Sequence, residues 1–237
     1  MKISVFSAGL LSLLAITSAS AQELSVKVTN LTNGMYFTPL LVAAHSDNID
    51  LFEAGMPATT NLQAMAEGGN IRGLVNDVAN AGADYVANPA AGRLAPGAST
   101  VAVINTSKKR NNRLSVVAML IPTNDAFVGA DSLEIPNESG TYVYYLNAYD
   151  SGTEANDEIV NGAGTPGSPG SPPDPGNHAD RGATGVTNVV FNRTVHIHPG
   201  IIGDMNPTGG ISDLNPIVHR WLNPVAKLEV VVKKDER

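Results

Sequence analysis

The 237-residue sequence contains no cysteine, one tryptophan and only 5% aromatic residues, and its basic side chains are outnumbered by acidic ones. The absence of cysteine excludes disulfides, thiolate metal ligands and a cysteine nucleophile. Lysine and arginine total 15 against 22 aspartate and glutamate, which argues against nucleic acid or anionic lipid as a partner, because both require a basic surface. A hydrophobic content of 43% still allows a substantial core and excludes a wholly disordered protein.

The start of the chain has the features of a secretory signal peptide. Met1-Lys2 forms a short positive region, residues 3–16 are apolar, and Ala19-Ser20-Ala21 provides the small side chains that a signal peptidase requires. The apolar run is too short to cross about 30 Å of hydrocarbon, and no later segment is as apolar. We therefore predict removal of residues 1–21. Residues 22–237 would remain as one exported domain, periplasmic or secreted, with no transmembrane segment.

Much of the remaining sequence alternates apolar and polar residues, which is typical of half-buried β-strands. One candidate strand, Tyr36 to Ala44, is interrupted by Pro39. Turn-rich connections and the shortage of helices favour an all-β fold, an antiparallel β-sandwich of about eight strands, over a parallel α/β sheet. The clearest expected strands cover residues 24–31, 99–105, 113–121, 141–148, 193–198 and 226–233.

Two segments depart from the strand pattern. Residues 59–81 predict a short helical insertion, capped by Thr59 or Thr60, whose apolar side chains recur at helical spacing and should pack onto the sandwich. Residues 161–177 contain ten Gly or Pro in seventeen positions. Such a composition predicts an irregular, exposed loop within the domain.

A pair of histidines offers one candidate metal site. His196 and His198 are separated by one residue in an expected strand, so both imidazoles would point the same way and could meet one Zn²⁺ or Cu²⁺. The glutamate that a cupin-like site would add is missing from Pro199–Ile202. The alternative is a polar strand face that carries two histidines without a metal. Any further ligand would have to come through the fold from His45, His178 or His219.

Acidic residues form a second candidate site. Asp125 and Asp131 flank a short apolar stretch, and an acidic segment from Asp150 to Glu158 follows the strand expected at 141–148. Hard oxygen ligands grouped at strand ends suit Ca²⁺, which takes 6–8 oxygens at about 2.3–2.6 Å. The alternative is an acidic, solvated turn, and the spacing alone leaves both interpretations open.

At these residues the sequence resembles a known family. Pro122–Leu133, followed by Tyr149–Glu154, resembles the spondin N-terminal domain of F-spondin-type matrix proteins, in its bacterial exported branch. The family's run P-S-x-D-W-F-V-G-x-D-S-L and its downstream D-A-G-T-D loop are both matched. Ala126 departs from the pattern, because the family usually has tryptophan there. The likeness extends over residues 24–232.

The resemblance implies an eight-stranded antiparallel sandwich related to C2 domains, with Ca²⁺ bound at one end. Carried over by position, the metal ligands would be Asp131, Asp150 and Glu154. Glu154 departs from the family's aspartate, although the longer glutamate can chelate with both oxygens. Animal members also carry disulfides and adhesive partner domains, which this chain lacks, so roles in cell guidance are not transferred.

Two classes of function remain open. The first is an exported calcium-binding module with an adhesion or matrix/surface-interaction role, whose partner would be a protein or a surface glycan. The second is a metal-dependent enzyme that uses His196 and His198 or the acidic cluster, although the sequence specifies no catalytic residue. Histidines converging with a third ligand would favour the enzyme. Carboxylates clustered apart from the histidines would favour the module.

Overall fold

The computed structural model describes residues 22–106, 110–179 and 182–234. The predicted signal peptide, residues 1–21, lies outside this range. Within the described residues, no helix has the length and apolar character needed to cross a membrane.

The described chain is mostly β-structure, with ten strands and three short helices. The strands are β1 (Gln22–Asn30), β2 (Tyr36–Phe37), β3 (Leu41–His45), β4 (Asp84–Ala87), β5 (Ser99–Thr106), β6 (Arg113–Ile121), β7 (Ala126–Glu134), β8 (Gly140–Asp150), β9 (His196–Ile197) and β10 (Ala226–Lys234). The helices are α1 (Thr60–Gly68), α2 (Arg72–Asn80) and α3 (Pro216–His219). Every pairing between these strands is antiparallel, which confirms the all-β antiparallel class.

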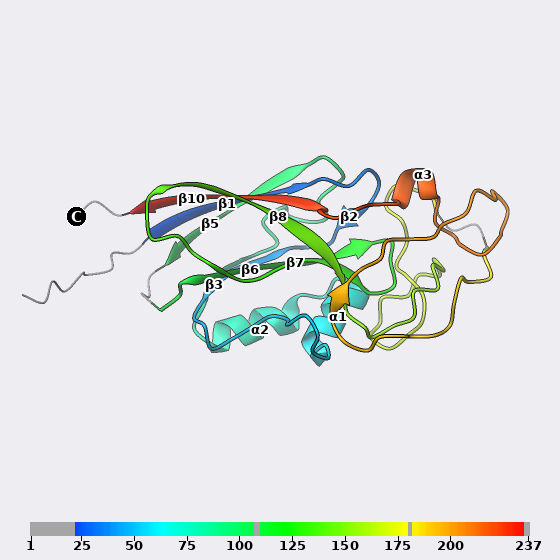
Figure 1. The fold of residues 1–237 in the computed structure, drawn as a ribbon, viewed down its shortest axis with the longest axis horizontal. Coiled ribbons are helices and arrows are strands. Elements are labelled where there is room, and N and C mark those ends of the chain that lie inside the picture. The colour runs from blue at the N-terminus through cyan, green and yellow to red at the C-terminus, as the bar shows by residue number, and fades with distance from the viewer. Residues whose placement is uncertain (1–21, 107–109, 180–181, 235–237) are drawn as a thin grey trace, which may run out of the picture.

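One continuous sheet folds over to form two facing halves. Its order is β4-β3-β6-β7-β8-β10-β1-β5, and β8 belongs to both halves. The first part of β8 pairs with β10, whereas its last residues, 147–150, pair with β7. Figure 1 shows β3, β6 and β7 in one layer, facing β10, β1 and β5 in the other. Because the halves are continuous through β8, the architecture lies between a sandwich and a closed barrel.

The alternation of the sequence explains which side chains enter the core. In β5 the exposed and buried residues alternate without exception, as the period of two predicts. β6 is instead buried on both faces, because one face lines the space between the sheet halves and the other is covered by the helical insertion. Leu62 and Met65 of α1, with Leu74 and Val78 of α2, form that second core. The predicted helical insertion is therefore confirmed.

Local capping accounts for the bounds of α1. The Thr59 hydroxyl accepts a hydrogen bond from the Leu62 amide at 3.1 Å, and Gly69 ends the helix with a φ of 67°.

Several elements differ from the expectation. β7 was not expected as a strand, since its first five residues are buried on both faces and show no alternation. The expected strand at 193–198 is reduced to the two residues of β9. Residues 161–177 contain no helix or strand, as predicted, but Ser171 and Asp174 are buried, so the loop is not wholly exposed. Figure 1 shows that this loop belongs to a long irregular region at one end of the sheet.

Candidate functional site

The candidate site lies where β7 begins and β8 ends. Ala126 pairs with Asp150, so Asp125, one residue earlier, lies beside the loop that leaves β8. Asp125 is completely buried. Its Oδ2 accepts hydrogen bonds from the Ser151 hydroxyl at 2.9 Å and from the amides of Thr153 and Glu154 at 2.9 and 3.2 Å. Its Oδ1 is buried and has no hydrogen-bond partner.

Glu154 joins the same cluster with a second unpartnered oxygen. Its Oε1 accepts hydrogen bonds from the Asn124 side chain at 3.0 Å and from the Gly170 amide. Its Oε2 is buried without a partner. The Asp125 and Glu154 carboxylates thus each keep one buried oxygen without a hydrogen-bond partner. This arrangement is costly unless a proton or a cation occupies it.

Asp150 completes the carboxylate cluster. Its two oxygens accept hydrogen bonds from the Gly152 amide and the Asn156 side chain, both at 2.7 Å. Gly152 has a φ of 71°, and a Cβ there would lie 2.7 Å from backbone atoms of Thr194. Only glycine therefore allows this tight path of the loop after β8.

The electrostatics of the cluster favour neutralisation. Burial raises the pKa of Asp125 to about 7, and the neighbouring charge of Asp150 acts in the same direction, although hydrogen bonds from the loop partly oppose both. Burial likewise raises the pKa of Glu154 to about 7. A buried carboxylate is unfavourable in its ionised form, and without a cation it avoids this cost by binding a proton. A bound cation would instead stabilise the ionised form.

Asp131 does not join this cluster, contrary to the predicted ligand set. It lies on β7, five residues beyond Ala126, and an extended strand of that length spans about 17 Å. Its neighbours are Ser115, whose hydroxyl is 3.5 Å from Oδ1, and the backbone of Leu51 and Phe52. Asp131, Asp150 and Glu154 therefore do not converge, because the β7–β8 register holds the first apart from the other two.

Asp125 belongs to the acidic candidate site that the sequence indicates, but it is not in the ligand set implied by the family resemblance. The family-like run contains two aspartates, and only the one directly before β7 reaches the end of β8. As the side chains stand, the described part of the chain contains no three His, Asp or Glu residues placed to hold a metal ion. A cation at this cluster would therefore also need backbone or amide oxygens and water.

His196 of β9 and His198, directly after that strand, both face the same cluster. Their Nε2 atoms lie 3.7 Å (His196) and 3.9 Å (His198) from Asp150 Oδ2, as their spacing in a strand predicts. The Gly200 amide donates to His198 Nδ1 at 3.0 Å, so the hydrogen of the neutral ring is on Nε2, which faces Asn156 Oδ1 at 3.3 Å. Burial lowers the pKa of His198 to about 4, which keeps the ring neutral. His198 Nε2 is therefore a donor and not a free metal ligand.

A small cavity connects the cluster with solvent. It measures about 180 Å³, and its lining includes Asp150, Glu154 and His196. Phe191 also lines it and is 90% exposed. Asp150 and Glu154 line this cavity, whereas Asp125 lies behind them and is fully buried.

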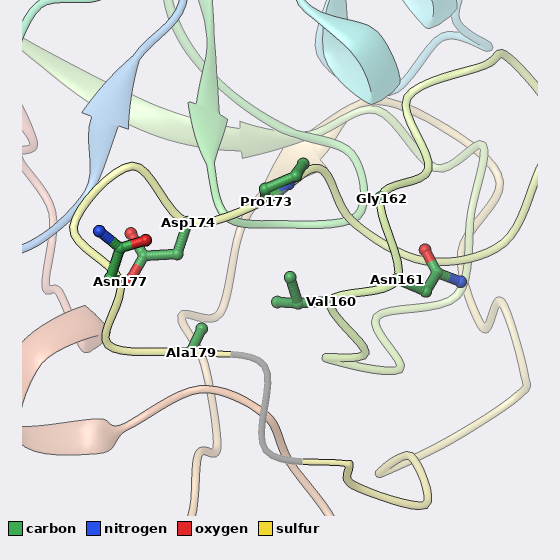
Figure 2. Close-up of a pocket in the computed structure, with 7 residues that line it drawn as sticks. All are labelled: Val160, Asn161, Gly162, Pro173, Asp174, Asn177 and Ala179. Carbon is green, nitrogen blue, oxygen red and sulfur yellow. The ribbon is translucent and has the colours of Figure 1, made fainter.

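A larger cavity lies elsewhere, lined mainly by the Gly/Pro-rich loop. It has a volume of about 480 Å³, and Figure 2 shows Asp174 and Asn177 close together in its wall, with Val160 also lining the space. Burial alone would raise the pKa of Asp174, but hydrogen bonds, first among them one from His219, outweigh it and hold the pKa at about 2. His219 Nε2 lies 3.3 Å from Asp174 Oδ2, and both side chains are buried. This pair anchors the loop to α3 rather than offering free ligands.

The other two histidines that the sequence offered as ligands also lie away from the cluster. His45, on β3, contacts the Ser46 carbonyl and the Ser115 hydroxyl. The backbone amide of His178 donates to Asp174 in the loop.

The chain matches a known protein family. No curated protein matches the chain. The Spondin_N family profile matches residues 29–162, from the end of β1 through β8 and the loop that carries the carboxylate cluster. The match covers more than half of the chain, and the protein therefore belongs to the Spondin_N family.

Proposed function

We propose that this protein is an exported calcium-binding module with an adhesion or surface-interaction role. Its family membership supports an extracellular, matrix-type module, and spondin N-terminal domains are not a known enzyme family. The observation that carries the calcium proposal is the pair of buried, unpartnered oxygens, Asp125 Oδ1 and Glu154 Oε2.

The chemistry of the donors favours calcium over softer metals. Asp125, Asp150 and Glu154 contribute carboxylate oxygens from one strand start and one strand end. Ca²⁺ accepts carboxylate, carbonyl, amide and water oxygens in flexible geometry, so it tolerates a site that is not closed by protein side chains alone. The bound cation would supply the positive charge that these carboxylates lack, and would tie the start of β7 to the loop after β8.

The metal-dependent enzyme receives less support. His196 and His198 approach a common carboxylate, but the hydrogen on His198 Nε2 prevents that atom from binding a metal. If His198 bound a metal through Nε2, the ring hydrogen would move to Nδ1, and the Gly200 amide would lose its hydrogen-bond acceptor. His198 is better explained as a group that orients Asn156, whose side chain in turn donates to Asp150 Oδ2.

Calorimetric titration of Ca²⁺ into EDTA-treated protein at about pH 8 tests the proposal. Binding with a dissociation constant of about 0.1–1 mM is expected for an extracellular module. Asp125→Asn and Glu154→Gln should each weaken it at least about tenfold, because each removes a carboxylate with an unpaired oxygen. Asp131→Asn is the matched control and should bind as the unmodified protein does. Absence of binding heat, or equal weakening by the control, contradicts the assignment.

A further inference from the structure

A second candidate binding site lies where β7 and β8 separate. Their ladder ends at the pair Gly129–Asn147, and from Leu146 backwards β8 pairs with β10 instead. The two strands therefore diverge as they join different halves of the sheet. A groove of about 350 Å³ occupies the gap, lined on one side by Gly129–Asp131 and Leu133 and on the other by Tyr144–Asn147.

The charge of this groove is negative. Asp131 and Glu53 both line it, and none of the described residues in its lining is Lys, Arg or His. Asp131 is only partly exposed, and burial, together with the nearby charge of Asp50, raises its pKa to about 6. Its strongest hydrogen-bonding neighbours are backbone amides rather than a counter-charge. Asp131 therefore gains from a positively charged ligand.

Aromatic rings supply the remaining walls. Tyr144, Tyr145 and Tyr149 line the groove with Phe52, and the Phe52 and Tyr149 rings lie 4.9 Å apart at 57°. Tyr145 is 62% exposed, so its ring is accessible. Aromatic faces attract ammonium groups, and long aliphatic stems lie well against them.

We propose that this groove binds the ammonium group of a lysine side chain presented by a partner protein. Asp131 would pair with the ammonium, and Tyr145 and Tyr149 would cover its aliphatic stem. The chain's net charge of −7 favours approach of a basic partner. The volume suits a side chain with part of its main chain, since it lies at the small end of ligand pockets, about 300–1,000 Å³.

The inference rests on the proposed surface-interaction role, for which it names the kind of partner, but it does not rest on calcium. Asp131 lies about 17 Å along β7 from the carboxylate cluster. Lysine binding should therefore be the same in excess EDTA and in Ca²⁺. This separates failure of the calcium proposal from failure of the groove.

Amide-detected NMR titration with the peptides Gly-Lys-Gly and Gly-norleucine-Gly tests the inference. Both peptides are N-acetylated and share the aliphatic stem, so only the first carries an ammonium group. We expect Gly-Lys-Gly to shift signals of residues 129–133 and 144–149 with millimolar affinity, at least about fivefold tighter than the norleucine peptide. Asp131→Asn should remove this preference, and Tyr145→Ala, an exposed position that leaves the core intact, should weaken binding of both peptides severalfold.

Glu229→Gln provides the control, because Glu229 lies on β10 and pairs with Lys227 at 3.4 Å. It should leave the affinity for Gly-Lys-Gly unchanged. Equal binding of the two peptides, or unchanged lysine preference in folded Asp131→Asn, would overturn the proposal. So would shifts confined to residues 150–158, which would place the ammonium at the carboxylate cluster.

Discussion

Calcium should stabilise this protein at pH 8 and lose that effect at pH 5, because calcium and protons compete for the same carboxylates. Burial raises the pKa of Asp125 and of Glu154 to about 7 each. At pH 8 both groups are mostly ionised, whereas at pH 5 both are protonated. Displacing a proton from a group of pKa 7 at pH 5 costs about 3 kcal/mol, so the calcium affinity should fall about 100-fold for each proton displaced.

The sign of the pH effect follows from proton linkage. Because both pKa values are raised above their unfolded values, the folded protein without calcium holds more protons than the unfolded chain between about pH 4 and 7, and these carboxylates contribute less stability as the pH rises. His198 acts in the opposite direction, since burial lowers its pKa from 6.5 to about 4 and stability rises with pH across that range. The free energy of unfolding is compared with calcium and with EDTA at each pH. The difference between the two values isolates the effect of the carboxylates from that of His198.

The expected size can be measured by thermal unfolding. With about 10 mM Ca²⁺ at pH 8, a dissociation constant of about 0.1–1 mM adds about 1.4–2.7 kcal/mol to the free energy of unfolding. For a chain of this length that corresponds to about 3–11 °C in Tm. Asp125→Asn should reduce the shift to about half or less, and Asp131→Asn should keep it. Equal shifts at pH 5 and pH 8 would refute the competition with protons, and superimposed melts at pH 8 would refute the calcium site.

Three further predictions concern the elements around the site. Thr59→Ala removes the N-cap of α1 and should lower the free energy of unfolding by about 1 kcal/mol in a denaturant titration, with Thr60→Ala, one residue later, as the milder control. Gly152→Ala places a Cβ 2.7 Å from the Thr194 backbone at a positive φ, so it should lower the free energy of unfolding by more than about 1 kcal/mol. It should also weaken calcium binding in calorimetry. Normal binding would contradict the argument that the loop requires glycine. His219→Ala leaves the buried Asp174 without its side-chain donor and should lower the free energy of unfolding by about 3 kcal/mol. The loss should appear as faster proteolysis within residues 161–177. Unchanged cleavage would show that the pair does not anchor the loop.

The sequence by itself determined the elements whose signals are local. Alternation identified β1, β5 and β10, because the two faces of each strand contrast in polarity. Helical spacing with a threonine cap identified α1 and α2. Glycine and proline content identified an irregular segment at residues 161–177, since neither residue supports a regular element there. The motif around β7 and the end of β8 also identified the family.

Only the tertiary structure decided which acidic residues meet. β7 is buried on both faces where it begins, so no alternation marked it as a strand, and its register with β8 could not be anticipated. That register places Asp125 next to Asp150 and Glu154 and places Asp131 further along β7. All four residues lie within the two segments that resemble the family. The groove beside Asp131 likewise exists because β8 leaves β7 for β10. Strand pairing depends on contacts between residues far apart in the chain, and residue spacing alone does not encode them.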